Sequence, residues 1–197
     1  FFGAAGFGIW AYTGMQDYKN NVEPKIATAV VKAEEATSTK KDKEFAEKEK
    51  QPLRNYTGPT EYGSLSINYP KTWSVYADET STGSAHVTAY FNPNFVPGIQ
   101  SNNNVALRVE VINTAYSQVV STIDSSVESG KVTAKPYSLA TLPSVVGLRL
   151  DGEVVDQKQG AMIILPLRDK TIKVWTEASQ FVADFNNIIL PNTTFVP

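Results

Sequence analysis

The chain has 197 residues, of which 42% are hydrophobic and 19% charged, and its formal net charge at neutral pH is -2. This hydrophobic fraction is sufficient for a core, so the chain need not be disordered. Proteins that bind nucleic acids usually carry a strongly basic surface that neutralises phosphates. Because the net charge of this chain is slightly negative, we expect no nucleic-acid partner. With no cysteine and one histidine, disulfides, thiol chemistry and multi-histidine metal sites are excluded.

The first 16 residues carry no charge. As a helix they would measure about 24 Å, which is shorter than the roughly 30 Å hydrocarbon core of a bilayer. Two hypotheses remain open. In the first, the segment is the outer half of a transmembrane anchor. In the second, Phe1 is a processed terminus and the helix packs against copies of itself through its small residues. We predict an anchor or assembly helix over residues 1–18, with contacts from Phe1, Phe2, Gly3, Ala4, Phe7, Gly8, Ile9, Trp10 and Tyr12.

Residues 19–59 are predicted to form a charged helical stalk and a linker. Residues 25–50 are rich in Ala, Glu and Lys, which favour helices. Their apolar positions do not continue as one stripe, which favours a solvated single helix over a coiled coil. A flexible charged linker is the alternative. The helix is expected to end before Pro52, Gly58 and Pro59, which mark a domain boundary.

Residues 60–197 are predicted to form a globular α+β domain. The alternation of Leu65, Ile67 and Tyr69 indicates a strand with one buried face. Further strands are expected over residues 73–75, 85–91, 104–112, 144–153, 160–167 and 171–176. Amphipathic helices are expected over residues 116–130 and 178–190.

The opening of this domain resembles the PsbP-like family, whose domains begin with a strand, then Tyr-Pro-x-x-Trp, then another strand. Here the motif is Tyr69-Pro70-Lys71-Thr72-Trp73. The resemblance covers residues 58–197. It implies an antiparallel sheet flanked by helices. The expected fold class is therefore α+β, with this sheet following the long N-terminal helix predicted above. It also implies a non-catalytic binding or assembly module on an extracytoplasmic surface.

The N-terminus resembles that of type IV pilins, which begin with Phe, continue as an apolar helix and carry a β-rich head. Phe1 matches, and Pro24 lies near the place where many pilin helices are interrupted. The chain departs from the pattern at Ala5, where pilins usually have a Glu that pairs with the terminal amine of a neighbour. The resemblance covers about 25 residues and implies self-assembly into a filament.

No residue pattern indicates catalysis. His86 is the single histidine, and it lies in a predicted strand. Asp151, Glu153 and Asp156 cluster near a predicted hairpin, but their spacing lacks the EF-hand pattern, so a solvated turn is favoured over a Ca²⁺ site. The body has no Gly-rich phosphate loop and no Gly-x-Ser-x-Gly elbow. We therefore expect no enzyme activity, no cofactor and no metal.

The loop over residues 92–104 is the best candidate for recognition. It displays Phe95, Val96 and Ile99 among polar residues, and exposed aromatic side chains on a loop often mark an interface. The alternative is that Phe95 and Ile99 pack beneath the loop.

Two functional hypotheses follow. The first is a non-catalytic, extracytoplasmic cell-surface protein that acts as a structural subunit of an envelope or pilus-like filament. Its partners would be copies of itself through the N-terminal helix, the membrane, or both. The alternative is a membrane-anchored, PsbP-like binding module for an envelope protein or glycan.

Overall fold

The computed structural model describes residues 15, 28, 30–80, 83–98 and 103–197. The chain divides into two compact units, residues 1–49 and residues 50–197. The predicted contact residues from Phe1 to Tyr12 lie outside the described residues, and so does Ile99. The anchor, assembly and pilin hypotheses for the N-terminus therefore remain predictions.

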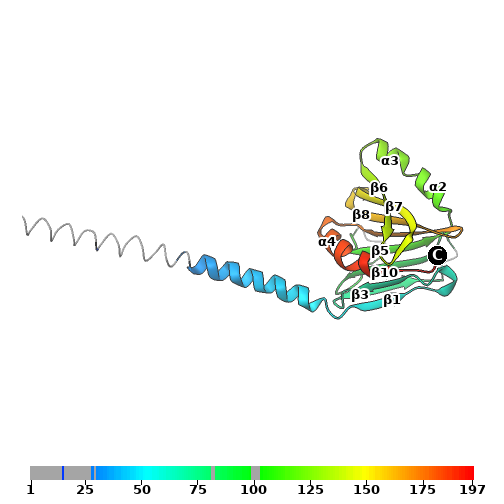
Figure 1. Cartoon of the computed structure of the whole chain (residues 1–197). Coiled ribbons are helices and arrows are strands. Elements are labelled where there is room, and N and C mark those ends of the chain that lie inside the picture. Colours follow the sequence, from blue (N-terminus) through cyan, green and yellow to red (C-terminus); the bar gives the residue numbers. More distant parts are fainter. Residues whose placement is uncertain (1–14, 16–27, 29, 81–82, 99–102) are drawn as a thin grey trace, which may run out of the picture. The chain divides into compact units, whose positions relative to one another are not determined.

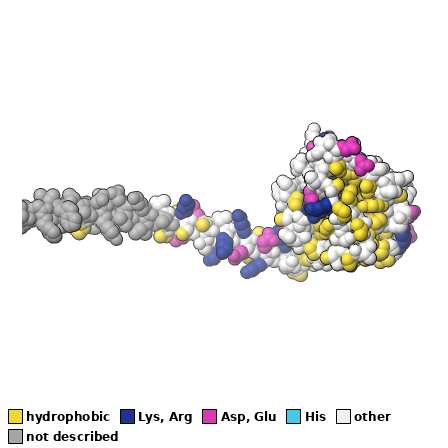
Figure 2. All heavy atoms as spheres, turned by 45° about the horizontal axis from the view of Figure 1, so that its top comes forward, with side chains coloured by type: hydrophobic (Ala, Val, Ile, Leu, Met, Phe, Trp, Pro, Cys, Tyr) yellow, Lys and Arg dark blue, Asp and Glu magenta, His cyan; other side chains and the backbone are white. Residues whose placement is uncertain are grey.

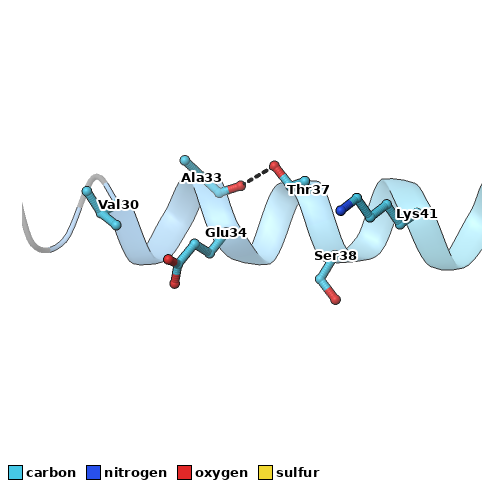
Figure 3. A pocket seen from close by; sticks show the side chains of 6 residues that line it. All are labelled: Val30, Ala33, Glu34, Thr37, Ser38 and Lys41. Atoms are coloured by element: carbon cyan, nitrogen blue, oxygen red, sulfur yellow. Dashed lines mark hydrogen bonds between the residues drawn. The ribbon is translucent and has the colours of Figure 1, made fainter.

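Residues 30–49 form one α-helix, and every one of these residues is exposed. Side chains of both charges lie along it (Figure 2). Within it the Thr37 hydroxyl donates a hydrogen bond of 2.7 Å to the carbonyl of Ala33 (Figure 3). The predicted helix is thus confirmed over this range, and the stalk remains a prediction. Before this range only Met15 and Thr28 are described. None of the helices within the described residues has the length and hydrophobicity that crossing a membrane requires.

A seven-stranded antiparallel sheet forms the centre of the second unit (Figure 1). Its spatial order is β3–β4–β5–β9–β8–β7–β6. The strands are β3 (Trp73–Asp78), β4 (Ala85–Pro93), β5 (Leu107–Ile112), β6 (Val132–Leu139), β7 (Leu142–Val155), β8 (Lys158–Leu167) and β9 (Lys170–Thr176). The predicted α+β fold with an antiparallel sheet is confirmed.

A smaller sheet packs against the face of the large sheet that carries the main hydrophobic core, which we call the inner face. Its order is β1 (Arg54–Thr57), β2 (Ser66–Tyr69) and β10 (Thr193–Thr194), so the first and last strands of the unit flank β2. We expected residues 51–59 to be a linker, and this was wrong for β1. The strand forms because Tyr56 pairs with Ile67 and joins the core, while its neighbours face solvent.

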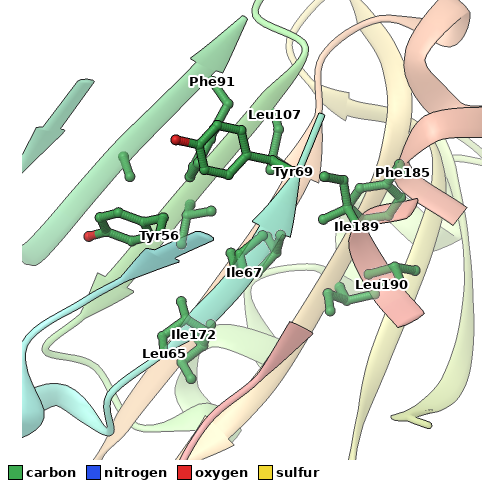
Figure 4. Close-up of a cluster of buried hydrophobic side chains, with 14 of the residues drawn as sticks. Tyr56, Leu65, Ile67, Tyr69, Phe91, Leu107, Ile172, Phe185, Ile189 and Leu190 are labelled. Carbon is green, nitrogen blue, oxygen red and sulfur yellow. The ribbon is translucent and has the colours of Figure 1, made fainter. Parts of the chain in front are cut away.

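The main hydrophobic core lies between the two sheets and the C-terminal helical segment. That segment consists of η2 (Ser179–Phe181), α4 (Val182–Asp184), η3 (Phe185–Ile189) and η4 (Leu190–Asn192). Figure 4 shows Phe185, Ile189 and Leu190 of this segment close to Ile67 and Tyr69 of β2. The large sheet contributes Val87, Ala89, Phe91, Leu107, Val109, Val111, Ile163, Leu165, Ile172 and Val174.

A second hydrophobic cluster lies on the other face of the large sheet. Two short helices, α2 (Tyr116–Ser121) and α3 (Asp124–Glu128), lie over β6, β8 and β9 there. We expected one helix over residues 116–130, but it is interrupted at Thr122 and Ile123. The cluster consists of Val119, Val132, Leu150, Met162, Ile164 and Trp175.

The strand β6 was also missed by the sequence prediction. It contains Pro136, and four consecutive residues of its eight are exposed, so it lacks the alternation of a half-buried strand. A proline is tolerated because β6 is an edge strand and pairs on one side only, with β7.

A polar network links β7 to the C-terminal helical segment. The guanidinium of Arg149 donates 2.7 Å hydrogen bonds to Asn186 Oδ1 and to Asp151 Oδ1. The hydrogen bonds from Arg149 hold the pKa of Asp151 below its ordinary value of 3.8.

We predict that Asp151→Asn lowers the free energy of unfolding near pH 7 by at most about 1 kcal/mol, because the pair is partly exposed. A carboxyl with a lowered pKa stabilises the folded state only while it is ionised. The difference from the wild type should therefore vanish as the pH falls through that lowered pKa. Urea unfolding near pH 7 and near pH 2 measures it. A difference that persists unchanged in acid would contradict this prediction.

We also predict that Phe185→Ala lowers the free energy of unfolding by about 3–5 kcal/mol, because it leaves a cavity in the main core. Phe185 is 1% exposed, whereas Phe95 is 69% exposed. The matched control Phe95→Ala should change stability by no more than about 0.5 kcal/mol. Denaturant unfolding of both variants tests this, and equal losses would show that the core is placed wrongly.

Candidate functional site

A row of aromatic and charged side chains crosses the outer face of the large sheet. In the strand register, Tyr76 lies opposite Tyr90, Tyr90 opposite Arg108, and Arg108 opposite Trp175. Because side chains alternate along a strand, these four share one face. Their neighbours in sequence, such as Phe91 and Val174, belong to the core on the inner face. We call this row, together with Phe95 of the adjacent loop, the aromatic–arginine surface.

The part of the outer face formed by β3, β4 and β5 is less covered than the rest. The principal contacts of α2 and α3 are with β6, β8 and β9, on the other half of the sheet. Tyr76, on the edge strand β3, is 48% exposed. Tyr90, on the adjacent strand β4, is only 8% exposed, so the accessible part of this face is its β3 edge.

Arg108 lies between two aromatic rings. Its guanidinium carbon is 4.9 Å from the centre of the Tyr90 ring and 5.0 Å from that of Trp175. Lys173 Nζ lies 5.1 Å from the Trp175 ring. Cations at these distances are attracted to the negative faces of the rings, most strongly where water is excluded.

Two carboxylates complete the arrangement around Arg108. Its Nη2 lies 2.8 Å from Glu110 Oε1, and its Nη1 lies 3.6 Å from Glu177 Oε1. Lys158 Nζ is 2.6 Å from the second oxygen of Glu177. The Glu177 side chain is only 3% exposed, and a carboxylate so deeply buried is stable only when it is paired. The two cations therefore supply both of the ion pairs of this buried carboxylate.

A pocket of about 130 Å³ opens beside these groups. Strand residues and residues immediately after strands form one side of it, and the loop that follows β4 forms the other. The lining consists of Tyr90, Arg108, Lys158 and Glu177, with Pro97, Gly98, Asn103 and Val105 from the loop. Burial in this setting raises the pKa of the Tyr90 hydroxyl above its ordinary value of 10.0, so Tyr90 is a neutral hydrogen-bond donor.

Two buried N–H groups in this cluster have no hydrogen-bond partner. They are Arg108 Nε and Trp175 Nε1, and no other buried side-chain polar atom of the described residues is unpaired. Buried polar groups are nearly always paired, since an unpaired donor costs about 1–3 kcal/mol. Both exceptions thus fall on neighbouring side chains of one site.

The predicted recognition loop is fixed to the same end of the sheet. The side-chain amide of Asn92 donates a 3.0 Å hydrogen bond to the carbonyl of Phe95. The hydroxyl of Ser74 donates a 2.6 Å bond to the carbonyl of Asn94. The structure places Phe95 at the surface, 69% exposed, and Val96 half-buried. Of the two alternatives for Phe95, exposure is therefore the one observed.

The other sequence candidates lie elsewhere. His86 stacks on the ring of Tyr62, with centres 4.8 Å apart and planes 5° from parallel. The acidic residues near the hairpin pair with cations of the chain itself, Asp151 with Arg149 and Glu153 with Lys131. Across the described ranges, no three His, Asp or Glu side chains gather in a way that could hold a metal ion.

Two other hollows offer less chemistry. One, of about 450 Å³, is lined only by residues of the helix over 30–49, so it is the open flank of a single helix (Figure 3). The other, of about 130 Å³, lies between α2, α3 and the sheet. Its lining is mostly the second hydrophobic cluster, with Glu153 and Lys173 as its charged members.

Sequence reasoning missed Tyr90, Arg108 and Trp175. Each stands in a predicted strand among hydrophobic neighbours, and the signal available was an aromatic or charged residue on the strand face opposite the core. That signal could not show that the three meet, because β5 and β9 are separated by more than fifty residues of chain.

We predict that Arg108→Met lowers the free energy of unfolding by about 1–3 kcal/mol, because buried Glu177 then keeps only one of its cations. The matched control is Arg168→Met, at an exposed turn residue. It should change stability by no more than about 0.5 kcal/mol. Denaturant unfolding of the two variants measures the difference, and a neutral Arg108→Met would mean that the cluster does not depend on this cation.

Comparison with known proteins gives little more than a distant likeness. No protein-family model matches the chain, and no curated protein matches it. Among solved structures, the chain is similar to the solution structure of cyanobacterial PsbP (CyanoP) from Synechocystis sp. PCC 6803. The two share 12% identity, the match covers 73% of this chain and 92% of that one, and the TM-score is 0.43. So low a TM-score supports no inference, and membership of the PsbP-like family remains a prediction.

Proposed function

We propose that this chain is a non-catalytic binding module, held outside the cytoplasm by its apolar N-terminal segment. Its partner contacts the aromatic–arginine surface and enters the adjoining pocket. The observation that carries this proposal is that exposed Tyr76 stands in one row across the sheet with Tyr90 and with Arg108, whose Nε–H is unpaired.

The composition of this surface is that of a binding site. Tyrosine, tryptophan and arginine are enriched among the residues that contribute most to protein–protein affinity. Tyr76 and Phe95 are exposed, whereas Arg108 and Trp175 lie deeper. The face of the body that Figure 2 shows carries a broad area of hydrophobic side chains with a few charged ones among them. An aromatic side chain as exposed as Phe95, on a loop held by two hydrogen bonds, suits an interface whose geometry is formed before binding.

The chemistry of the pocket favours recognition over catalysis. A general base needs a free lone pair and a pKa near the working pH. Glu177, the one carboxylate of the pocket, is engaged by Lys158 and Arg108. The single histidine stacks on Tyr62, outside the residues that line the pocket.

The N-terminal unit suits display of the body. A helix of 20 residues is about 30 Å long, and the one over residues 30–49 is exposed on all sides. Attachment through residues 1–18 is part of the proposal, in either of the forms left open by the sequence. The filament-subunit hypothesis depends on those same residues and remains a prediction.

Photo-crosslinking in native cells tests this function. We predict that benzoylphenylalanine placed at Phe95 or Tyr76 of the full chain yields the same discrete adduct, because both positions face the partner. The control position is Val146 of β7, which is 60% exposed and lies away from the aromatic–arginine surface. It should yield no such adduct.

Mass spectrometry of the adduct identifies the partner. An absence of adducts at all three positions would overturn the proposal of a binding module. Equal yields at Val146 and Phe95 would overturn the assignment of the surface.

A further inference from the structure

We infer that the recess of about 130 Å³ between the two short helices and the outer face of the large sheet binds a small, uncharged hydrophobic molecule. The ligand has about the bulk of one six-membered ring. The described residues that line the recess all lie outside the aromatic–arginine surface, so this site does not rest on the proposed function. The inference follows from the walls, the polar groups and the size of the recess.

The walls of the recess are two apolar surfaces that face each other. The helical segment contributes residues at positions i, i+3, i+4 and i+7, which share one side of it: Val119, Thr122, Ile123 and Ser126. The strands β6, β7 and β8 contribute Val132, Leu150, Val154, Met162 and Ile164. The members of the second hydrophobic cluster among these residues are each at most 8% exposed, so the recess reaches below the surface of the body.

The side chains of the second hydrophobic cluster leave this space unfilled. Protein interiors are close-packed, and voids larger than a water molecule are few in each domain. Here the helical segment is interrupted, since Thr122 and Ile123 separate α2 from α3, and both of these residues line the recess. Apolar side chains beside an unfilled space lack dispersion contacts on that side. A ligand that supplies those contacts is therefore stabilised.

The polar groups of the lining favour an uncharged ligand. Glu153 and Lys173 carry opposite charges, so the lining has no net charge. Glu153 lies 3.0 Å from Lys131 Nζ. Lys173 Nζ lies 5.1 Å from the centre of the Trp175 ring, and the Thr122 hydroxyl donates a 2.7 Å hydrogen bond to a backbone carbonyl of α2. Three of the four polar side chains of the lining thus have partners within the chain, and a charged ligand would lose its water for little return.

The size of the recess limits the ligand to one small ring or a short branched chain. An engineered cavity of roughly 150 Å³, lined by Leu, Ile and Phe, binds benzene. The recess has nearly this volume and a similar apolar wall, and the flexible thioether of Met162 can adjust to the shape of the ligand. A peptide side chain of the same bulk would bring polar backbone groups to the rim, where Thr122 and Glu153 are already bonded. A free molecule is therefore favoured over a side chain of a partner.

Met162 is a direct reporter of this site. The chain has two methionines, and the other, Met15, belongs to the first unit. In the full chain, labelled with ¹³C at the methionine methyl groups and held in phospholipid nanodiscs, we predict that benzene shifts the Met162 signal and that the shift saturates. Pyrazine keeps the shape of the ring but carries two nitrogen acceptors, and it should leave the signal in place. Any change at Met15 should grow with the benzene concentration without saturating.

A matched pair of variants locates the binding. Ser126 and Ser125 are neighbours in α3, but only Ser126 lines the recess, and Ser125 is exposed. Ser126→Leu fills the space and should weaken benzene binding by about tenfold or more, because the ligand then loses its contacts with the wall. Ser125→Leu adds the same side chain outside the recess and should leave the affinity unchanged. The titration of the wild type decides the inference even if Ser126→Leu is poorly folded.

The outcomes distinguish the possible occupants. A saturating shift with benzene and none with pyrazine supports an apolar site. No shift with benzene, or equal shifts with both rings, would overturn the inference. Equal affinities of Ser126→Leu and Ser125→Leu would overturn its placement in the recess. Binding of N-acetyl-phenylalanine amide tenfold or more tighter than benzene would overturn the assignment to a free molecule. Crosslinking at Phe95 is a separate result, because Phe95 does not line the recess.

Discussion

The pairing of β5 with β9 is the contact on which the rest of the body depends. It joins two antiparallel meanders, β3–β4–β5 and β6–β7–β8–β9, into one sheet. The register places Val109 opposite Val174 and Val111 opposite Ile172, all four on the core side. A slip of one residue would turn these side chains to the outer face, so burial fixes the register.

The same register builds the aromatic–arginine surface. Setting Val109 against Val174 on the inner face necessarily sets Arg108 against Trp175 on the outer face. The two consequences are inseparable because side chains alternate along each strand. The stability of the core therefore holds the binding groups in place, and the site needs no separate support beneath it.

The two faces of the sheet are used differently. The inner face is covered by the small sheet and the C-terminal helical segment, and its residues are hydrophobic. The outer face is shared between the short helices α2 and α3 and the open region over β3, β4 and β5. Near that region the buried carboxylate of Glu177 lies between two cations, Arg108 and Lys158. Apolar residues of similar volume can often replace a buried ion pair without loss of stability. Its presence alongside two unpaired donors is the reason to regard this region as a site rather than as another part of the core.

By itself the sequence determined most of the strands, the antiparallel α+β class, the solvated helix over residues 30–49 and the loop that carries Phe95. These are local features, set by alternation, helix propensity and the placement of Pro and Gly. It did not reveal β1 or β6, because a short edge strand with exposed side chains, or with Pro136, lacks a periodic signal. Nor did it reveal that Tyr90, Arg108 and Trp175 meet, or that Glu177 is buried between Arg108 and Lys158. Those contacts arise only when strands distant in the chain pair in one register, and that register is decided by burial of the whole core.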